Sequence, residues 1–459
     1  MIKKKNIYFI GVGGIGMSAL ARYFNQKGYD VSGYDRTTTE LTRLLEAEGV
    51  TVSYVAEVDS IPNDFKAKES TLVVYTPAIS KQNPILDYFL NEGFECLKRA
   101  EVLGLLSKNL KTIAVAGTHG KTTVSSMIAY LLHRGGIKIN AFLGGISRDF
   151  DTNLLLDEGA EIMVTEADEY DRSFLQLNPN YLVITSIDAD HLDIYANHAE
   201  LKATYKQLVS QLEKGGVLLT KPAIIEALSL SDFEGKESYS IDSQASISAK
   251  NIHVKKGNFV FDYESPSLKI GGISCGLPGI HNVENAVAAI TAALKQGVSQ
   301  ESIKKAIGEF KGVKRRFDVH LKTDQLVYID DYAHHPEELK VLLASVRELY
   351  PTKKVTAIFQ PHLYSRTRDF GDEFAQVLSS ADELILLDLY PAREEPIEGI
   401  DSNWLAKKTA KKNVLVCHKN ELLGLLENRS VEVLLTIGAG DIDTLVQPIK
   451  THFEAIIMT

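Results

Sequence analysis

The sequence predicts an α/β protein of three domains whose sheets are mainly parallel. Apolar runs of strand length alternate with segments of helical periodicity along the whole chain, which is typical of parallel α/β sheets. The chain has 459 residues, of which 44% are hydrophobic, so it can bury several cores. Two glycine-rich turns each follow an apolar run and each open a block of such elements. We expect domains over residues 1–107, 108–312 and 313–459.

The first block opens with a strand expected over residues 6–10 and a turn of pattern Gly-x-Gly-x-x-Gly. Further strands are expected over residues 30–34 and 71–75. An aspartate directly follows the first of these two strands, about twenty residues after the turn. Read alone, this pattern predicts an NAD-binding domain. The pattern reports only a diphosphate at a helix N-terminus, so a UDP-sugar also fits, as does a packing turn without a ligand. The candidate substrate residues are Gly11, Gly13, Gly14, Gly16, Asp35 and Thr76.

The second block opens with the most informative stretch of the chain. The apolar run 112–116 leads into Gly-Thr-His-Gly-Lys-Thr-Thr, and a helical pattern follows. Backbone N–H groups of such a turn face nucleotide phosphates, the lysine reaches the outer phosphates, and a hydroxyl meets Mg²⁺. The longer consensus is not met, because Val115 stands where its first glycine belongs. The candidate nucleotide-binding residues here are Gly117, Thr118, His119, Gly120, Lys121, Thr122 and Thr123.

Polar side chains gather where the expected strands end, which is where ligands bind in open parallel sheets. Glu166 follows the strand expected over 161–165 and is a candidate Mg²⁺ ligand, because that cation prefers carboxylate oxygen. His191 follows the strand expected over 181–186, and it could hold a second metal ion or orient phosphate. Arg366 and Arg368 follow a strand of the third block, and their guanidinium groups suit an anionic substrate.

Composition excludes several classes of function. The net charge of -10 argues against a nucleic-acid partner. No apolar stretch approaches the roughly 20 residues that span a bilayer, so we expect no membrane insertion. No apolar segment follows the basic start, so we expect no signal peptide. Three widely spaced cysteines show no metal-ligand spacing, and we expect a cytoplasmic protein with unpaired thiols. The oligomeric state is not predicted.

An ordered set of motifs gives the chain a family resemblance. The phosphate turn is followed by Glu-Ala-Asp-Glu at 166–169, Asp-Ala-Asp-His at 188–191, and Gly-x-His-Asn-x-x-Asn at 279–285. The third block adds Arg-Arg-Phe at 315–317, Asp-Asp-Tyr-Ala-His-His-Pro at 330–336, and Phe-Gln-Pro-His at 359–362. In this order, and over essentially its whole length, the chain resembles the Mur ligases.

The resemblance implies the role of each domain. An N-terminal Rossmann-like domain would hold a UDP-sugar, a central P-loop ATPase-type parallel sheet would hold ATP, and a C-terminal Rossmann-like α/β domain would close over both. Lys121 would contact the outer phosphates, and Thr122, Glu166 and His191 would serve Mg²⁺ and phosphate. His281, Asn282 and Asn285 would lie near adenine, with Arg316 and Asp331 on ATP phosphate and ribose. Tyr332, His335, Arg366 and Arg368 would face the reacting carboxylate and the amino acid.

The implied activity is an ATP-dependent ligation of L-alanine to the lactyl carboxylate of UDP-N-acetylmuramate, through an acyl phosphate, in peptidoglycan precursor synthesis. Tyr170, Ala333 and Leu363 depart from the commoner family pattern. The first two also occur in a related ligase that attaches a recycled tripeptide to the same UDP-sugar, which is the alternative within the family. Outside the family, an NAD-dependent dehydrogenase would explain the first block but not Lys121, and a P-loop switch or motor ATPase would explain Lys121 alone.

Overall fold

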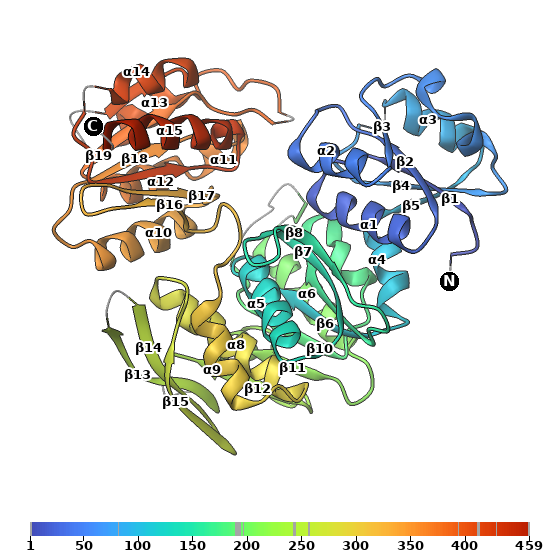
Figure 1. Ribbon diagram of the computed structural model, residues 1–459, viewed down its shortest axis with the longest axis horizontal. Helices are drawn as coiled ribbons and strands as arrows, with labels where there is room; N and C mark the ends of the chain where they lie inside the picture. Colours follow the sequence, from blue (N-terminus) through green and yellow to red (C-terminus); the bar gives the residue numbers. More distant parts are fainter. Residues whose placement is uncertain are drawn as a thin grey trace. The chain divides into compact units, whose positions relative to one another are not determined.

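The described part of the chain forms three sheets covered by helices, which confirms the predicted α/β fold (Figure 1). It divides into two compact units. The first runs to Ile252 and adds Val260–Ser274 and Glu284–Lys311; the second runs from Gly312 and adds His253–Phe259 and Cys275–Val283. The expected limits of three domains stay a prediction. The computed structural model describes residues 2–80, 82–188, 194–195, 197–241, 245–255, 258–392, 394–410, 414–427 and 429–457.

The first sheet is parallel throughout, in the order β3-β2-β1-β4-β5. The strands expected over residues 6–10, 30–34 and 71–75 are confirmed with those limits. Every residue of the central strand is buried, as in strands with helices on both faces. Its strands are β1 (Asn6–Ile10), β2 (Asp30–Tyr34), β3 (Thr51–Ser53), β4 (Thr71–Tyr75) and β5 (Glu95–Lys98). Its helices are α1 (Ile15–Gln26), α2 (Glu40–Ala47), α3 (Pro84–Asn91) and α4 (Arg99–Ser107).

The second sheet has the order β15-β14-β13-β12-β11-β10-β6-β9-β7-β8. Its centre is parallel, β8 is antiparallel to β7, and β14 is antiparallel to β15. Its strands are β6 (Lys111–Ala116), β7 (Ile139–Ser147), β8 (Thr152–Leu156), β9 (Ile162–Ala167), β10 (Tyr181–Ile184), β11 (Val217–Thr220), β12 (Lys236–Ser240), β13 (Ile247–Lys255), β14 (Asn258–Ser265) and β15 (Leu268–Ser274). Its helices are α5 (Lys121–Arg134), α6 (His198–Ser210), α7 (Pro222–Ala227), α8 (Ile280–Lys295) and α9 (Gln300–Glu309).

The third sheet has the order β16-β17-β21-β18-β19-β20, and only β16 is antiparallel to its neighbour. Successive residues of its strands point to opposite faces of the sheet, where they form two hydrophobic cores. One core also contains residues of α10 and α12, and the other contains residues of α14 and α15 (Figure 1). Its strands are β16 (Asp318–Lys322), β17 (Val327–Asp331), β18 (Val355–Phe359), β19 (Glu383–Leu387), β20 (Val414–Cys417) and β21 (Val433–Ile437). Its helices are α10 (Pro336–Leu349), α11 (Tyr364–Asp369), α12 (Gly371–Leu378), α13 (Ser402–Lys408), α14 (Leu422–Leu426) and α15 (Val446–Ile457).

Two strand ends differ from the sequence prediction, and both differences concern candidate site residues. β9 continues to Ala167, so Glu166 lies inside the strand rather than after it. β10 ends at Ile184, so Thr185 and Ser186 are loop residues rather than strand residues. Hydrogen bonding to neighbouring strands decides where a strand stops, and this is not visible in an apolar run.

Within the first unit, the first sheet is joined to the second through α1, which packs on β7 and β8. The contact contains a buried polar network. Asn153 Nδ2 donates to the carbonyl oxygen of Ile15 at 2.7 Å and to Ser18 Oγ at 2.9 Å, and Arg22 donates to Thr152 Oγ1 at 2.5 Å. The network fixes the start of α1 to the edge of the second sheet. Separately, no helix in the described part of the chain is long and apolar enough to cross a membrane.

Candidate functional site

The predicted phosphate loop joins β6 to α5 and depends on two glycines. Gly117 has φ +133° and Gly120 has φ +84°, a region that disfavours other residues. A Cβ atom on Gly117 would also overlap Thr185 Oγ1. Gly120 is the residue before the first turn of α5, so the free N–H groups of that turn begin at this loop. Thr123 lies half-buried in the same turn.

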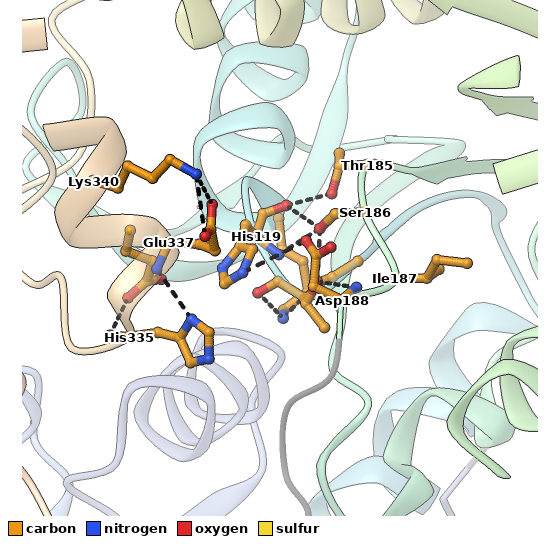
Figure 2. Close-up of polar contacts among 12 residues, drawn as sticks. His119, Thr185, Ser186, Ile187, Asp188, His335, Glu337 and Lys340 are labelled. Carbon is orange, nitrogen blue, oxygen red and sulfur yellow. Dashed lines mark hydrogen bonds and ion pairs between the residues drawn. The ribbon is translucent and has the colours of Figure 1, made fainter. Parts of the chain in front are cut away.

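Hydroxyl groups from the end of β10 hold the loop (Figure 2). Ser186 Oγ accepts the N–H of His119 at 2.8 Å and lies 2.8 Å from Thr118 Oγ1, while Thr185 Oγ1 donates to the carbonyl oxygen of His119. Thr118 Oγ1 in turn accepts the N–H of Asp188 at 3.0 Å. Thr185 and Ser186 were not among the predicted site residues, although two hydroxyl residues at the end of an apolar run could have indicated them.

Lys121 is the first residue of α5 and is engaged with the loop and with an acid. Its Nζ donates to the carbonyl oxygen of Gly117 at 2.6 Å and lies 2.9 and 3.0 Å from the two carboxylate oxygens of Glu169. Burial lowers the pKa of Lys121, but the carboxylates of Glu169, Asp168 and Glu166 outweigh burial and hold the pKa above its ordinary value. Lys121 is therefore positively charged at neutral pH.

Thr122 and Glu166, two candidate metal ligands, contact each other beside the loop. Thr122 Oγ1 donates to Glu166 Oε2 at 2.8 Å. The glutamate occupies the space left by Gly144 of β7, where a Cβ atom would overlap its carboxylate. His191, the third candidate metal ligand, lies outside the described residues. Among the residues that the structure describes, no three or more His, Cys, Asp or Glu side chains form a metal-binding group.

The three residues predicted near adenine divide between the two compact units. Asn285 belongs to the first unit, and a Cβ atom on Gly120 would lie 3.1 Å from its side-chain oxygen, so it lies beside the phosphate loop. His281 and Asn282 belong to the second unit. His281 Nδ1 lies 3.5 Å from Ser345 Oγ, and Asn282 Nδ2 donates to the carbonyl oxygen of Pro278 at 2.6 Å. Burial lowers the pKa of His281 to about 4.

The structure brings together the predicted residues of the first sheet. Gly11, at φ +86°, donates its N–H to the carbonyl oxygen of Tyr34 at 2.7 Å, and the Thr76 side chain lies against it. Asp35 Oδ2 accepts the N–H of Gly13 at 2.8 Å, so Asp35 holds the turn itself. Gly14 is the residue before α1.

Arg99 is a further cation at this turn, and sequence analysis missed it. A Cβ atom on Gly16 would come within 2.7 Å of Arg99 Nη1, so the guanidinium group lies against the turn. The same side chain lies 3.9 Å from Asp168 Oδ2, in the loop after β9. Arg99 thus lies between the glycine turn of the first sheet and the acidic loop of the second.

In the second unit, Asp331 at the end of β17 holds two backbone segments. Its carboxylate accepts the N–H of Phe317 at 2.6 Å and the N–H of Ala333 at 2.8 Å. Burial raises the pKa of Asp331 to about 6, against the lowering effect of the Arg316 charge. The Arg316 guanidinium lies 5.3 Å from the centre of the Tyr332 ring. The structure therefore places Arg316, Asp331 and Tyr332 in one cluster.

His335 precedes α10 and is buried. Its ring lies 4.8 Å from that of Phe370, and its Nδ1 accepts the N–H of Glu337 at 3.4 Å, a long contact drawn in Figure 2. The two predicted arginines of α11 differ. Arg368 is exposed and pairs with the adjacent Asp369 at 2.7 Å, whereas Arg366 is half-buried and its charge acts on His334.

The fold and the site together define a class of protein with three α/β sheets. The second sheet carries a loop of the form that binds nucleotide phosphates, and this loop lies at the carboxyl end of a central strand. Three family models match the chain: "Mur ligase family, catalytic domain" over residues 6–111, "Mur ligase middle domain" over 115–293, and "Mur ligase, glutamate ligase domain" over 315–440. The chain belongs to the Mur ligase family.

Relatives cover the whole chain. A protein of Christiangramia forsetii named UDP-N-acetylmuramate–L-alanine ligase is 47% identical over 97% of each chain, and one of the same name from Parabacteroides distasonis is 48% identical over 97% of this chain and 96% of its own. A solved UDP-N-acetylmuramate-alanine ligase from Thermotoga maritima matches with a TM-score of 0.83 and 27% identity over 98% and 99% of the two chains. A murein peptide ligase from Psychrobacter arcticus, at 23% identity and TM-score 0.71 over 98% of each chain, shares the fold.

Proposed function

We propose that the chain is an ATP-dependent ligase that joins L-alanine to the lactyl carboxylate of UDP-N-acetylmuramate, a step of peptidoglycan precursor synthesis. The observation that carries this proposal is the loop 117–122, where a half-buried lysine, a hydroxyl and a carboxylate lie together at the carboxyl end of β6. Relatives of full length that are named for this reaction support the choice of substrates.

In this proposal the loop binds ATP. The charged Lys121 contacts the outer phosphates, and the N–H groups that begin α5 face them. Asn285, beside Gly120, extends the site toward the base. By resemblance to the family, Arg316 and Asp331 are proposed to contact ATP phosphate and ribose, and His281 and Asn282 to contact adenine.

Thr122 and Glu166 fit a magnesium ion. The ion prefers hard oxygen ligands and, at nucleotide phosphates, takes only one or two from the protein, so one hydroxyl and one carboxylate suffice. When bound, the ion would neutralise phosphate charge. His191 is proposed as a further ligand or phosphate contact.

The turn of the first sheet is proposed to hold the UDP-sugar. Its glycines let a diphosphate approach the start of α1, and Arg99 adds a positive charge beside Gly16. Because Asp35 already binds the N–H of Gly13, we assign it to the shape of the turn rather than to a ribose hydroxyl. Thr76 lies against Gly11 and completes this group.

The chemistry needs position and positive charge rather than a nucleophilic side chain. The lactyl carboxylate attacks the γ-phosphate of ATP, which gives an acyl phosphate and ADP. The amine of L-alanine then attacks the acyl carbon, and phosphate leaves. Lys121 stabilises charge in the first step. Arg366 and His335 are proposed to orient the carboxylate and the amino acid in the second.

An amino-donor panel tests the proposal. Purified protein with ATP, Mg²⁺ and UDP-N-acetylmuramate should release phosphate with L-alanine, and much less with glycine, serine or the tripeptide L-alanyl-γ-D-glutamyl-diaminopimelate. Preference for the tripeptide would select the recycling reaction instead, and NAD binding without UDP-sugar binding would select a dehydrogenase. Lys121→Ala should lose ADP formation yet keep UDP-sugar binding, while Lys111→Ala, at the exposed start of β6, should keep both.

A further inference from the structure

Glu169 engages the ammonium group of Lys121 from a buried position. Lys121 Nζ lies 2.9 and 3.0 Å from its two carboxylate oxygens, and also donates to the carbonyl oxygens of Gly117 at 2.6 Å and Thr118 at 3.4 Å. A lysine has three N–H donors, so all three are engaged. To contact a nucleotide phosphate, Lys121 must therefore give up at least one of these partners.

The position of Glu169 is set by its own backbone rather than by Lys121. Its carbonyl oxygen accepts the Tyr195 hydroxyl at 2.6 Å and the N–H of Arg172 at 2.9 Å. The next turn is held by Lys98, which binds Asp171 at 2.7 Å. Glu169 is fully buried, and these contacts of its backbone and of the next turn fix the position of its carboxylate.

The partners of Lys121 differ in what their loss costs. A carbonyl group that loses one hydrogen bond is neutral and has a second lone pair for other donors. Separating a fully buried carboxylate from a lysine 2.9 Å away removes a charge-assisted contact, which is the more costly change. The carbonyl oxygens of Gly117 and Thr118 are therefore the partners that Lys121 can exchange for phosphate.

We propose that Glu169 is a positioning residue that keeps its ion pair with Lys121 when nucleotide binds, so that Lys121 exchanges the loop carbonyls for a phosphate oxygen. The inference rests on the proposed ATP site and adds a residue to which neither sequence nor family resemblance assigned a role. Glu169 then determines the position of the Lys121 ammonium group and does not compete with phosphate for that group.

A double-mutant cycle on the full-length chain tests this. Affinity for the non-hydrolysable analogue AMPPNP with Mg²⁺ is measured by calorimetry for the wild type, Glu169→Gln, Lys121→Met and the double variant. Glu169→Gln keeps the shape but removes the charge, and we expect it to weaken binding about tenfold. In the Lys121→Met background the same change should have no further effect. Glu161→Gln, which removes an exposed carboxylate directly before β9, should bind as the wild type does.

Three results would overturn the inference. Tighter or unchanged binding by Glu169→Gln would mean that the carboxylate competes with phosphate or is irrelevant to it. Equal weakening with and without Lys121 would mean a structural role only. If Lys121→Met bound AMPPNP as the wild type does, the proposed ATP site itself would be wrong. Should Lys121→Met fail to fold, Glu169→Asp replaces it: that variant keeps the charge and should recover most of the affinity lost in Glu169→Gln, and no recovery would contradict the inference.

Discussion

At the scale of single residues, the site depends on small side chains that leave room for charged ones. Gly144 lies inside β7, where a glycine weakens a strand and marks a close approach. The approach is that of Glu166, whose carboxylate occupies the space of the missing Cβ atom and accepts the Thr122 hydroxyl. The candidate magnesium ligand is thus positioned by a residue on a neighbouring strand.

Gly144→Ala should abolish most activity while the protein still folds. The new methyl group overlaps the end of a flexible side chain, so Glu166 moves away from Thr122 and the backbone is spared. We expect kcat to fall about 100-fold, the effect of a misplacement of about 1 Å. Turnover at several Mg²⁺ concentrations measures this, with Gly424→Ala, a helix glycine with open space around it, as the control. Unchanged turnover would contradict the role of Glu166.

At the scale of elements, the site is assembled from segments that follow strands. The end of β10 holds the phosphate loop through two hydroxyls, and α11 presents two arginines that are close in sequence but unlike in surroundings. Leu363, the residue before α11, has φ +69°, which is unusual for leucine. The start of this helix is therefore held in a strained conformation.

Arg366→Ala should impair amide formation more than Arg368→Ala. Arg366 is half-buried and close enough to His334 to affect its pKa, whereas Arg368 is exposed and paired with Asp369. An exposed ion pair is worth little, so Arg368→Ala should stay within about threefold of the wild type. For Arg366→Ala we expect kcat/KM for L-alanine to fall about 100-fold. Steady-state kinetics with varied L-alanine compares the two, and a larger loss in Arg368→Ala would reverse the assignment.

At the scale of the whole molecule, stability depends on how the sheets are joined and on buried groups within each unit. Asn153 is fully buried and connects β8 to the start of α1, so it holds the first sheet to the second. In the second unit, burial lowers the pKa of His334 to about 4, and the charge of Arg366 acts in the same direction while that of Glu338 opposes it.

Asn153→Ala should lower the free energy of unfolding by about 1–3 kcal/mol, because it removes two hydrogen bonds in a buried site, one to the Ile15 carbonyl oxygen and one to Ser18 Oγ. Chemical denaturation measures the change. Asn109→Ala removes a similar side-chain bond, to the carbonyl oxygen of Leu105, at an exposed position and should change stability little. Equal losses of unfolding free energy in the two variants would contradict the role of this hydrogen-bond network in joining the first sheet to the second.

Stability of the second unit should fall when pH is lowered from 7 to 5. A histidine with a folded-state pKa near 4 and an unfolded value near 6.5 takes up a proton on unfolding in this range. The stability present above pH 6.5 is therefore lost toward pH 4, by up to about 2 kcal/mol at pH 5 for one such group. His334→Gln should flatten this dependence in denaturation curves followed by circular dichroism. A slope equal to that of the wild type would exclude His334 as the cause.

The class of fold, most of the expected strand positions and the phosphate loop could be predicted from residue patterns alone. These features are local: the period of apolar residues predicts strands and helices, and the loop contains its own glycines, lysine and hydroxyl. The loop could therefore be recognised before its surroundings were known. The family resemblance worked for the same reason, since it rests on the order of short motifs.

The partners of those residues could not be predicted, because they depend on how distant segments pack. Glu169 contacts Lys121 although the two residues are 48 positions apart in the sequence, and Ser186 contacts His119 although they are 67 positions apart. Gly144 makes room for Glu166 from the neighbouring strand β7, which is a matter of strand pairing. Burial sets the pKa of Asp331 and His334, and burial is a property of packing rather than of residue type. Sequence spacing does not predict such contacts, because the order of strands in a sheet differs from their order along the chain.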